Sequence, residues 1–399
     1  MNVLRNIKWL VTTECMYSVT SVFINTFIIA YIFELSGKSA VETGLYYLFR
    51  SVAVFIVAFI SGYYLKKHCK MSMYRLAPLL NLVLFALIYF LGDDVKNYTG
   101  YLGFISGNIV ILRWMPRNLL ISDLVSKEYM IKYQGYVSAI VGFTNIAIPF
   151  LLGLFLTFDS YNDVMMILSI LLLIELLSTF MVKENRANLS AQYEPVKYLK
   201  ILFKSKEPLF VCFMEFFRGL TLVGILPVLM KLYIVYLFVT PLKLGSLTSI
   251  FAFTTIIANF VFGKFCKYKY FSFILMFSTI VTILASLMFV LYPSSVSFLC
   301  YNFCFVSVAQ ILLTITLVNI FNVSNIKKIK ETYKTEYFAI REMFLNGGRI
   351  IGAGLLVLIS SYQDFEVLRY FILALTLSMI IMGWCAIKIN AYLETKTQN

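Results

Sequence analysis

Two acidic residues lie inside stretches of sequence that are otherwise apolar. Glu215 falls within the run 209–227, and Arg218 follows it three residues later, on the same face of a helix. Ionisable groups in a membrane-spanning helix cost roughly 2.5 to 3.5 kcal/mol each on insertion scales, so they usually face a protein interior or a hydrated cavity. Glu14 lies 201 positions before Glu215. This offset predicts two copies of one membrane unit, each beginning with an acidic span.

Glu14 and Glu215 are the candidates for proton coupling, because buried carboxylates serve as proton relays in membrane proteins. A carboxylate beside a fixed guanidinium stays ionised, which favours a structural ion pair between Glu215 and Arg218. Glu14 has no cation within two turns on its own polar stripe, so it is the favoured proton-linked residue. The alternative is a permanent bridge from Glu14 to Arg117 or Arg349.

Polar residues recur with helical spacing in several apolar stretches. A water-filled cavity requires such stripes, whereas hydrogen bonding between helices, worth about 0.6 kcal/mol per contact, is the alternative for their Ser and Thr members. Glu175, in the middle of another apolar stretch, is expected to form a structural pair. The stripes are Glu14, Ser18, Ser21 and Asn25; Ser106, Arg113 and Arg117; and Ser307, Gln310 and Thr314.

The composition is that of an integral membrane protein. Of the 399 residues, 60% are hydrophobic and only 14% are charged. The formal charge of +14 does not indicate nucleic-acid binding, because the basic residues lie in short connections between apolar runs. The seven cysteines are scattered, and the single histidine is His68 in a basic loop. This pattern predicts neither a disulfide framework nor a metal site, and no cofactor is expected.

Twelve stretches are long enough to cross a membrane. A hydrocarbon core about 30 Å thick needs about 20 apolar residues per helix. The residues that follow Met230 either extend the seventh span or lie along the interface. The expected spans are residues 9–33, 43–65, 75–91, 101–124, 135–157, 164–182, 209–230, 245–265, 271–292, 296–321, 343–361 and 367–387.

The basic residues predict the orientation. They crowd into alternate connections, and the other side holds only Lys38, Lys96, Lys231 and Lys243. Both termini are therefore expected in the cytoplasm, with the chain in the inner (plasma) membrane.

The longest connection, residues 183–208, is basic and separates an N-terminal six-helix bundle (1–182) from a C-terminal one (209–399). Its stretch 196–203 is amphipathic. This pattern favours a tether that lies against anionic lipid, with a regulatory site as the alternative.

Six spans, a linker and six further spans resemble the plan of the major facilitator superfamily. Within that superfamily, the chain resembles the bacterial drug, macrolide and siderophore exporters. The likeness rests on residues 34–70, 111–136 and 198–211. The cytoplasmic motif of the family runs from a glycine to an aspartate four residues later. Gly62 matches its first position, but Lys66 stands in place of the aspartate, so this position does not supply the acid of the charge-paired latch that the motif implies.

The resemblance implies an all-α membrane protein whose twelve transmembrane helices form two pseudo-symmetric six-helix bundles. It also implies a secondary active transporter that works by alternating access. Arginines outnumber acids in the spans, which favours an anionic or zwitterionic substrate over a cationic one. Proton-coupled antiport that exports a small amphiphilic molecule is expected, and a flippase for lipid headgroups is the alternative.

An enzyme is not expected, because the sequence has no nucleotide-binding loop, no paired metal ligands and no nucleophile beside a histidine. The expected partners are a small-molecule substrate, protons and membrane lipids, with no nucleic acid, and the chain is expected to act as a monomer. The residues expected to contact the substrate are Ser18, Ser21, Asn25, Arg113, Arg117, Arg218, Gln310 and Arg349, with Arg113, Arg117 and Arg218 holding its negative group.

Overall fold

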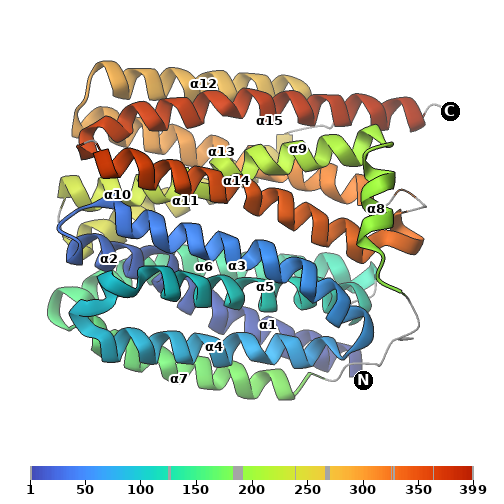
Figure 1. The fold of residues 1–399 in the computed structure, drawn as a ribbon, viewed down its shortest axis with the longest axis horizontal. Coiled ribbons are helices and arrows are strands. Elements are labelled where there is room, and N and C mark those ends of the chain that lie inside the picture. The colour runs from blue at the N-terminus through green and yellow to red at the C-terminus, as the bar shows by residue number, and fades with distance from the viewer. Residues whose placement is uncertain are drawn as a thin grey trace. The chain divides into compact units, whose positions relative to one another are not determined.

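The protein is seen in a computed structural model as an assembly of long helices, with no strand in the part of the chain that is described (Figure 1). That part comprises residues 2–124, 127–182, 192–238, 240–265, 270–324, 326, 329–362 and 364–397. Contacts divide the chain into two compact units. Unit 1 is Met1–Gln192 with Lys231–Ala252, and unit 2 is Tyr193–Met230 with Phe253–Asn399.

Unit 1 contains the first seven α-helices. A π-helical segment, η1, interrupts the first span between α1 and α2, and the 3-10 segment η2 joins α4 to α5. The elements are α1 (Asn2–Val22), η1 (Phe23–Ile28), α2 (Ile29–Leu35), α3 (Ala40–Lys67), α4 (Lys70–Leu91), η2 (Gly92–Tyr98), α5 (Thr99–Leu124), α6 (Lys127–Phe158) and α7 (Tyr161–Phe180).

Unit 2 contains the later helices, and α10 and α11 contribute residues to both units. A second π-helical segment, η3, interrupts the seventh span. The elements are α8 (Pro195–Leu202), α9 (Lys206–Leu220), η3 (Thr221–Ile225), α10 (Leu226–Phe238), α11 (Pro241–Phe265), α12 (Phe271–Leu291), α13 (Ser295–Ser324), η5 (Ile329–Tyr333), α14 (Lys334–Tyr362), η6 (Phe365–Val367) and α15 (Leu368–Thr397).

The helices confirm the prediction of twelve spans. Eleven segments of the described residues are long and apolar enough to cross a membrane. One of them, Lys70–Ile121, has 52 residues, which at 1.5 Å per residue is far longer than a bilayer core of about 30 Å. It consists of α4, η2 and α5 and therefore supplies two passes. The residues after Met230 extend the seventh span as part of α10.

In each unit, a glycine brings a helix that carries charged residues into backbone contact with its neighbour. In unit 1, a Cβ atom on Gly107 of α5 would lie 2.2 Å from the carbonyl oxygen of Arg50 on α3. In unit 2, a Cβ atom on Gly348 of α14 would lie 1.9 Å from the carbonyl oxygen of Phe216 on α9. Such close approach leaves no space for a larger residue, so these glycines set the depth and rotation of the helices that carry the charges.

The part of α11 that belongs to unit 1 approaches α6 closely. A Cβ atom on Gly245 would lie 2.2 Å from the carbonyl oxygen of Pro149, and one on Gly153 would lie 2.7 Å from that of Pro241. The predicted bundle boundaries at 182/183 and 208/209 do not coincide with this division by contacts, and they stay a prediction.

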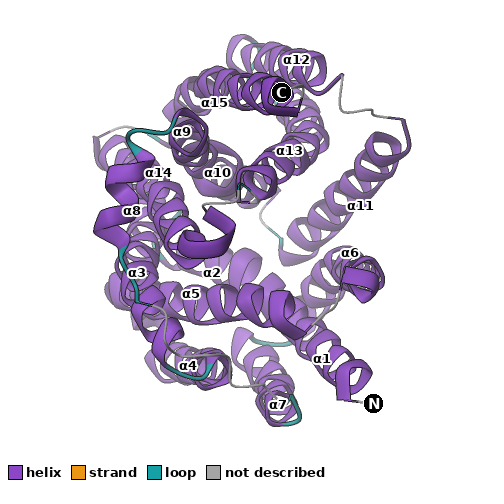
Figure 2. Ribbon diagram, turned by 90° about the vertical axis from the view of Figure 1, so that its right-hand side faces the viewer, coloured by secondary structure: helices purple, strands orange, loops and turns teal. Residues whose placement is uncertain are grey.

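Helix α8 forms the second part of the predicted linker. It runs crosswise to α9, α14 and α15 at one end of unit 2 and lies beside α14 at the edge of that unit (Figures 1 and 2). Tyr198 and Leu202 are buried, whereas Val196, Lys197 and Phe203 on other faces are exposed. Burial raises the pKa of Tyr198 above its usual value, so its phenol stays neutral at physiological pH. Contact with anionic lipid stays a prediction, and residues 183–191 of the linker lie outside the described part.

Candidate functional site

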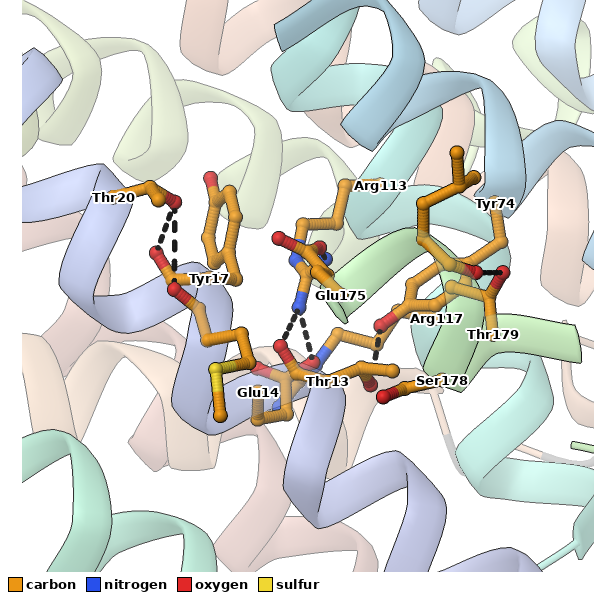
Figure 3. Close-up of polar contacts among 12 residues, drawn as sticks. Thr13, Glu14, Tyr17, Thr20, Tyr74, Arg113, Arg117, Glu175, Ser178 and Thr179 are labelled. Carbon is orange, nitrogen blue, oxygen red and sulfur yellow. Dashed lines mark hydrogen bonds and ion pairs between the residues drawn. The ribbon is translucent and has the colours of Figure 1, made fainter. Parts of the chain in front are cut away.

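Four charged residues from three helices meet in the interior of unit 1 (Figure 3). Glu14 lies on α1, Arg113 and Arg117 lie on α5, and Glu175 lies on α7. Glu14 Oε1 accepts hydrogen bonds from Arg117 Nε at 2.6 Å and from Arg113 Nη2 at 3.3 Å. Arg113 Nη1 forms an ion pair with Glu175 Oε1. All four side chains are buried. We call these four residues the unit 1 charge cluster.

Aromatic rings and a backbone carbonyl hold Arg113 in place. Its Nη2 atom also donates to the carbonyl oxygen of Thr13 at 3.0 Å. The guanidinium lies 3.8 Å from the ring centroid of Tyr17 and 5.1 Å from that of Tyr74. The hydroxyl of Tyr74 lies 3.1 Å from Thr13 Oγ1. A buried charge needs such partners, because leaving it unpaired in a medium of low dielectric is strongly destabilising.

Arg117 is held at the edge of the unit 1 charge cluster. Its guanidinium lies 5.0 Å from the ring centroid of Trp114, a residue on the same helix with a partly exposed ring. Cation–π contacts of this kind are worth about 0.5–1 kcal/mol at exposed sites and more when desolvated. Of the two bridges considered for Glu14, the structure contains the one to Arg117.

Unit 2 contains a second buried cluster around Glu215, which is fully buried on α9. Its Oε1 atom accepts from Arg218 Nε at 2.5 Å, and its Oε2 atom accepts from Arg218 Nη2 at 2.8 Å. Arg341 Nε on α14 donates to Oε2 at 2.5 Å, and Arg341 also lies 3.2 Å from Glu342. The pair predicted between Glu215 and Arg218 is therefore present, and Arg341 is an additional partner.

The polar stripe of α1 and η1 forms mostly local hydrogen bonds. Ser18 Oγ donates to the carbonyl of Cys15 at 2.8 Å and lies 3.2 Å from Thr144 Oγ1 on α6. Ser21 Oγ donates to the carbonyl of Ser18 at 3.1 Å. Asn25 Nδ2 donates to the carbonyl of Ser21 at 2.8 Å. These bonds orient the stripe, and Ser18 joins α1 to α6.

The remaining predicted substrate residues lie in unit 2 on two helices. Gln310 is partly buried on α13, and its carbonyl accepts from Thr314 Oγ1 at 3.0 Å. Arg349 on α14 donates from Nη1 to Asn346 Oδ1 at 3.1 Å. Whether these residues contact a substrate stays a prediction.

Each unit has a π-helical segment in its first span, and a basic side chain binds a backbone carbonyl of each segment. In η1, the carbonyl oxygen of Asn25 accepts from Lys231 Nζ at 2.5 Å. In η3, the carbonyl oxygen of Val223 accepts from Arg349 Nε at 3.1 Å. Gly224 in η3 has non-helical angles, φ −103° and ψ −124°. A π-helical turn disturbs the regular hydrogen-bond ladder, and such turns are frequent at functional sites.

Sequence reasoning misses three kinds of residue. Arg341 counts as a loop cation by sequence, because the polar first turns of α14 hide the start of that helix at Lys334. Lys231 counts as a loop cation beyond the seventh span. Tyr17 and Tyr74 carry no signal that separates them from the other aromatic residues of the spans. Among the described residues, no group of His, Cys, Asp and Glu could hold a metal ion.

Comparison with known proteins identifies the fold. No protein-family description matches the chain. No curated protein matches its sequence. Solved structures do match. A bacterial homologue of the iron transporter ferroportin, in an inward-facing state, has a TM-score of 0.69 at 14% identity, over 97% of this chain and 98% of that one. The chain has the major facilitator fold.

Two further structures with this fold match over nearly the full length. A mutant of the nucleoside transporter NupG has a TM-score of 0.69 at 13% identity, over 99% of both chains. A bacterial metal transporter has a TM-score of 0.62 at 13% identity, over 98% of both chains. The predicted fold class is thus confirmed, and these solved structures are transporters rather than enzymes. The three do not include a drug or siderophore exporter, so that finer resemblance is not tested by them.

Proposed function

We propose that this chain is a secondary active transporter that exports a small amphiphilic anion or zwitterion by alternating access, in exchange for protons. The main observation in support is a buried carboxylate at the matching position of the first span in each unit, Glu14 and Glu215, each bound by arginines. Each ionised group costs about 2.5 to 3.5 kcal/mol to place in a spanning helix. Groups retained at that cost mark a transport pathway by default.

Glu14 is the proposed proton carrier. Its carboxylate is bound by Arg117 and more distantly by Arg113. In the proposed cycle, Glu14 exchanges its bond to Arg117 for a proton when the helices move. Glu215 is bound on both oxygens by Arg218 and Arg341 and is less suited to the same role. Export is the direction that the sequence resemblance implies.

The first experiment identifies what the cells export. Metabolite profiles of the medium are compared between cells that express the native chain and cells that express Glu14→Gln. The metabolite that accumulates only with the native chain is then offered to everted membrane vesicles under a pH gradient. We expect uptake into these vesicles to stop with a proton uncoupler and to be absent for Glu14→Gln.

Controls separate this outcome from its alternatives. Glu366→Gln, at an exposed acid in η6, should transport like the native chain. Normal gradient-driven transport by correctly folded Glu14→Gln vesicles would remove Glu14 from the coupling mechanism. Transport of a lipid headgroup that persists with the uncoupler would instead support the flippase.

A further inference from the structure

Positive charge remains in unit 1 after the unit 1 charge cluster has been paired. Arg113 and Arg117, which were predicted to hold an anionic group, are already bound by Glu14 and Glu175. In unit 2, Arg218 is likewise bound by Glu215. The charge of each of these three guanidiniums is therefore already matched by a buried carboxylate.

Arg50 and Lys231 are in a different situation. Neither forms an ion pair with any carboxylate of the described residues. Both are only partly buried. Arg50 lies on α3, where its guanidinium is 5.6 Å from the ring centroid of Tyr47, and Lys231 lies on α10.

These two cations converge on one residue. Arg50 Nη1 donates to Asn25 Oδ1 at 2.8 Å, and Lys231 Nζ donates to the carbonyl oxygen of Asn25 at 2.5 Å. The bond from Asn25 Nδ2 to the carbonyl of Ser21 turns the amide oxygen toward Arg50. Two like charges on one asparagine repel each other in a site of low dielectric, and a bound anion relieves that repulsion. A guanidinium has five donors and an ammonium three, so each cation keeps donors for a ligand.

We propose that Asn25, Arg50 and Lys231 bind the anionic group, a carboxylate or a phosphate, of the transported substrate. This assignment rests on the proposed transport function and moves the anion site from Arg113, Arg117 and Arg218 to two cations that lack an acid. Lys231 is also the first residue of the part of α10 that belongs to unit 1, whereas Leu226–Met230 belong to unit 2.

Anion binding to the purified full-length chain tests the assignment without any transport. Thermal unfolding is followed while sodium benzoate or sodium phosphate is titrated at constant ionic strength against sodium chloride. We expect one of these anions to raise the unfolding temperature of the native chain in a saturable way, and the effective one identifies a carboxylate or a phosphate site. Arg50→Gln and Lys231→Gln should each weaken binding at least about tenfold, as expected for the loss of one charge-assisted hydrogen bond.

Matched variants show whether the effect belongs to the site. Lys243→Gln removes the same charge from an exposed position on the neighbouring helix α11 and should bind like the native chain. Arg50→Lys and Lys231→Arg keep the charges and should bind within a fewfold of it. If Lys231→Gln does not fold because the η1 carbonyl loses its donor, Arg50→Gln alone tests the site, since the Arg50 guanidinium donates to the side chain of Asn25 and not to the η1 carbonyl.

The results that overturn the assignment are distinct from failure of the transport function. The site is wrong if neither anion binds the native chain saturably, if Arg50→Gln binds as tightly as the native chain, or if Lys243→Gln weakens binding equally. Anion binding with the expected variant pattern, together with no export from vesicles, would leave the site in place and remove the proposed function. Proton-driven export, together with anion binding that neither Arg50→Gln nor Lys231→Gln weakens, would remove the site and leave the proposed function in place.

Discussion

At the scale of residues, the positive and negative charges of the unit 1 charge cluster are equal in number. Two carboxylates, Glu14 and Glu175, face two guanidiniums, Arg113 and Arg117, and Arg113 contacts both acids. Because Arg113 is the shared member, loss of either acid leaves it underpaired. The cluster is therefore a single unit in energetic terms, although its members come from three helices.

Replacement of Glu175 by Gln should destabilise the protein by about 3–5 kcal/mol, because it leaves Arg113 buried with half of its counter-charge. The double variant Glu175→Leu with Arg113→Met removes both charges and should recover most of that loss. Thermal and denaturant unfolding in detergent measure both effects. Lys197→Gln, at the exposed pair with Glu194, should cause no measurable change. A double variant that is no more stable than Glu175→Gln would show that Arg113 and Glu175 do not stabilise each other.

The charged members of the two clusters, except Arg341, could be found from sequence, whereas their pairing between helices could not. Charges in apolar runs are conspicuous, so Glu14, Glu215, Arg113 and Arg218 stand out by type alone. The contact between Arg113 and Glu175 depends on how α5 and α7 are rotated and placed, which no local pattern encodes. Only the pair of Glu215 with Arg218 follows from spacing, since three residues place both on one helix face.

At the scale of elements, hydropathy predicted the spans but not their irregular turns. The expected ranges lie within the observed helices for most of the chain, because about 20 apolar residues can cross a bilayer in only one regular way. The π-helical segments η1 and η3 change the hydrogen-bond register without any change in hydropathy. For that reason the sequence does not predict these two segments. It therefore does not predict that Lys231 and Arg349 donate to their backbone carbonyls.

The contact between α9 and α14 predicts opposite outcomes for two glycines of one helix. Gly348→Ala places a methyl group 1.9 Å from the carbonyl oxygen of Phe216, so the helices must separate, at a cost of about 1–3 kcal/mol or more. Gly354→Ala meets nothing within 4 Å and should be neutral or stabilising by up to about 1 kcal/mol through helix propensity. Unfolding temperatures of the two purified variants measure the difference. Equal stability would mean that the helices do not approach as closely as described.

At the scale of the whole molecule, the count of spans and the repeat of acidic first spans were sufficient to predict the fold. The repeat says that two similar units exist, and an even number of helices follows from it. The sequence does not say that Lys231–Ala252 packs with unit 1, because the close contacts in that grouping, such as those of Gly245 and Gly153, join residues far apart in the chain. Long-range packing of small residues has no periodic signature in a helix that is apolar all round.

The orientation of the chain is open to a labelling experiment. Cys69 is exposed between α3 and α4, on the side expected to be cytoplasmic, and Asn97 is exposed in η2 on the opposite side. In a background without other cysteines, a membrane-impermeant maleimide should label Asn97→Cys in intact cells. It should label Cys69 only after the cells are permeabilised. The reverse pattern would place both termini outside the cell.

The position of Trp114 beside Arg117 gives the protein an optical reporter of its own. The chain has only three tryptophans, and Trp9 and Trp384 can be changed to phenylalanine so that Trp114 is the remaining emitter. Indole emission responds to a cation 5.0 Å from the ring, and Arg117 is the arginine that binds Glu14 at 2.6 Å. A shift in its fluorescence would therefore follow, in real time, each departure of this guanidinium from the carboxylate.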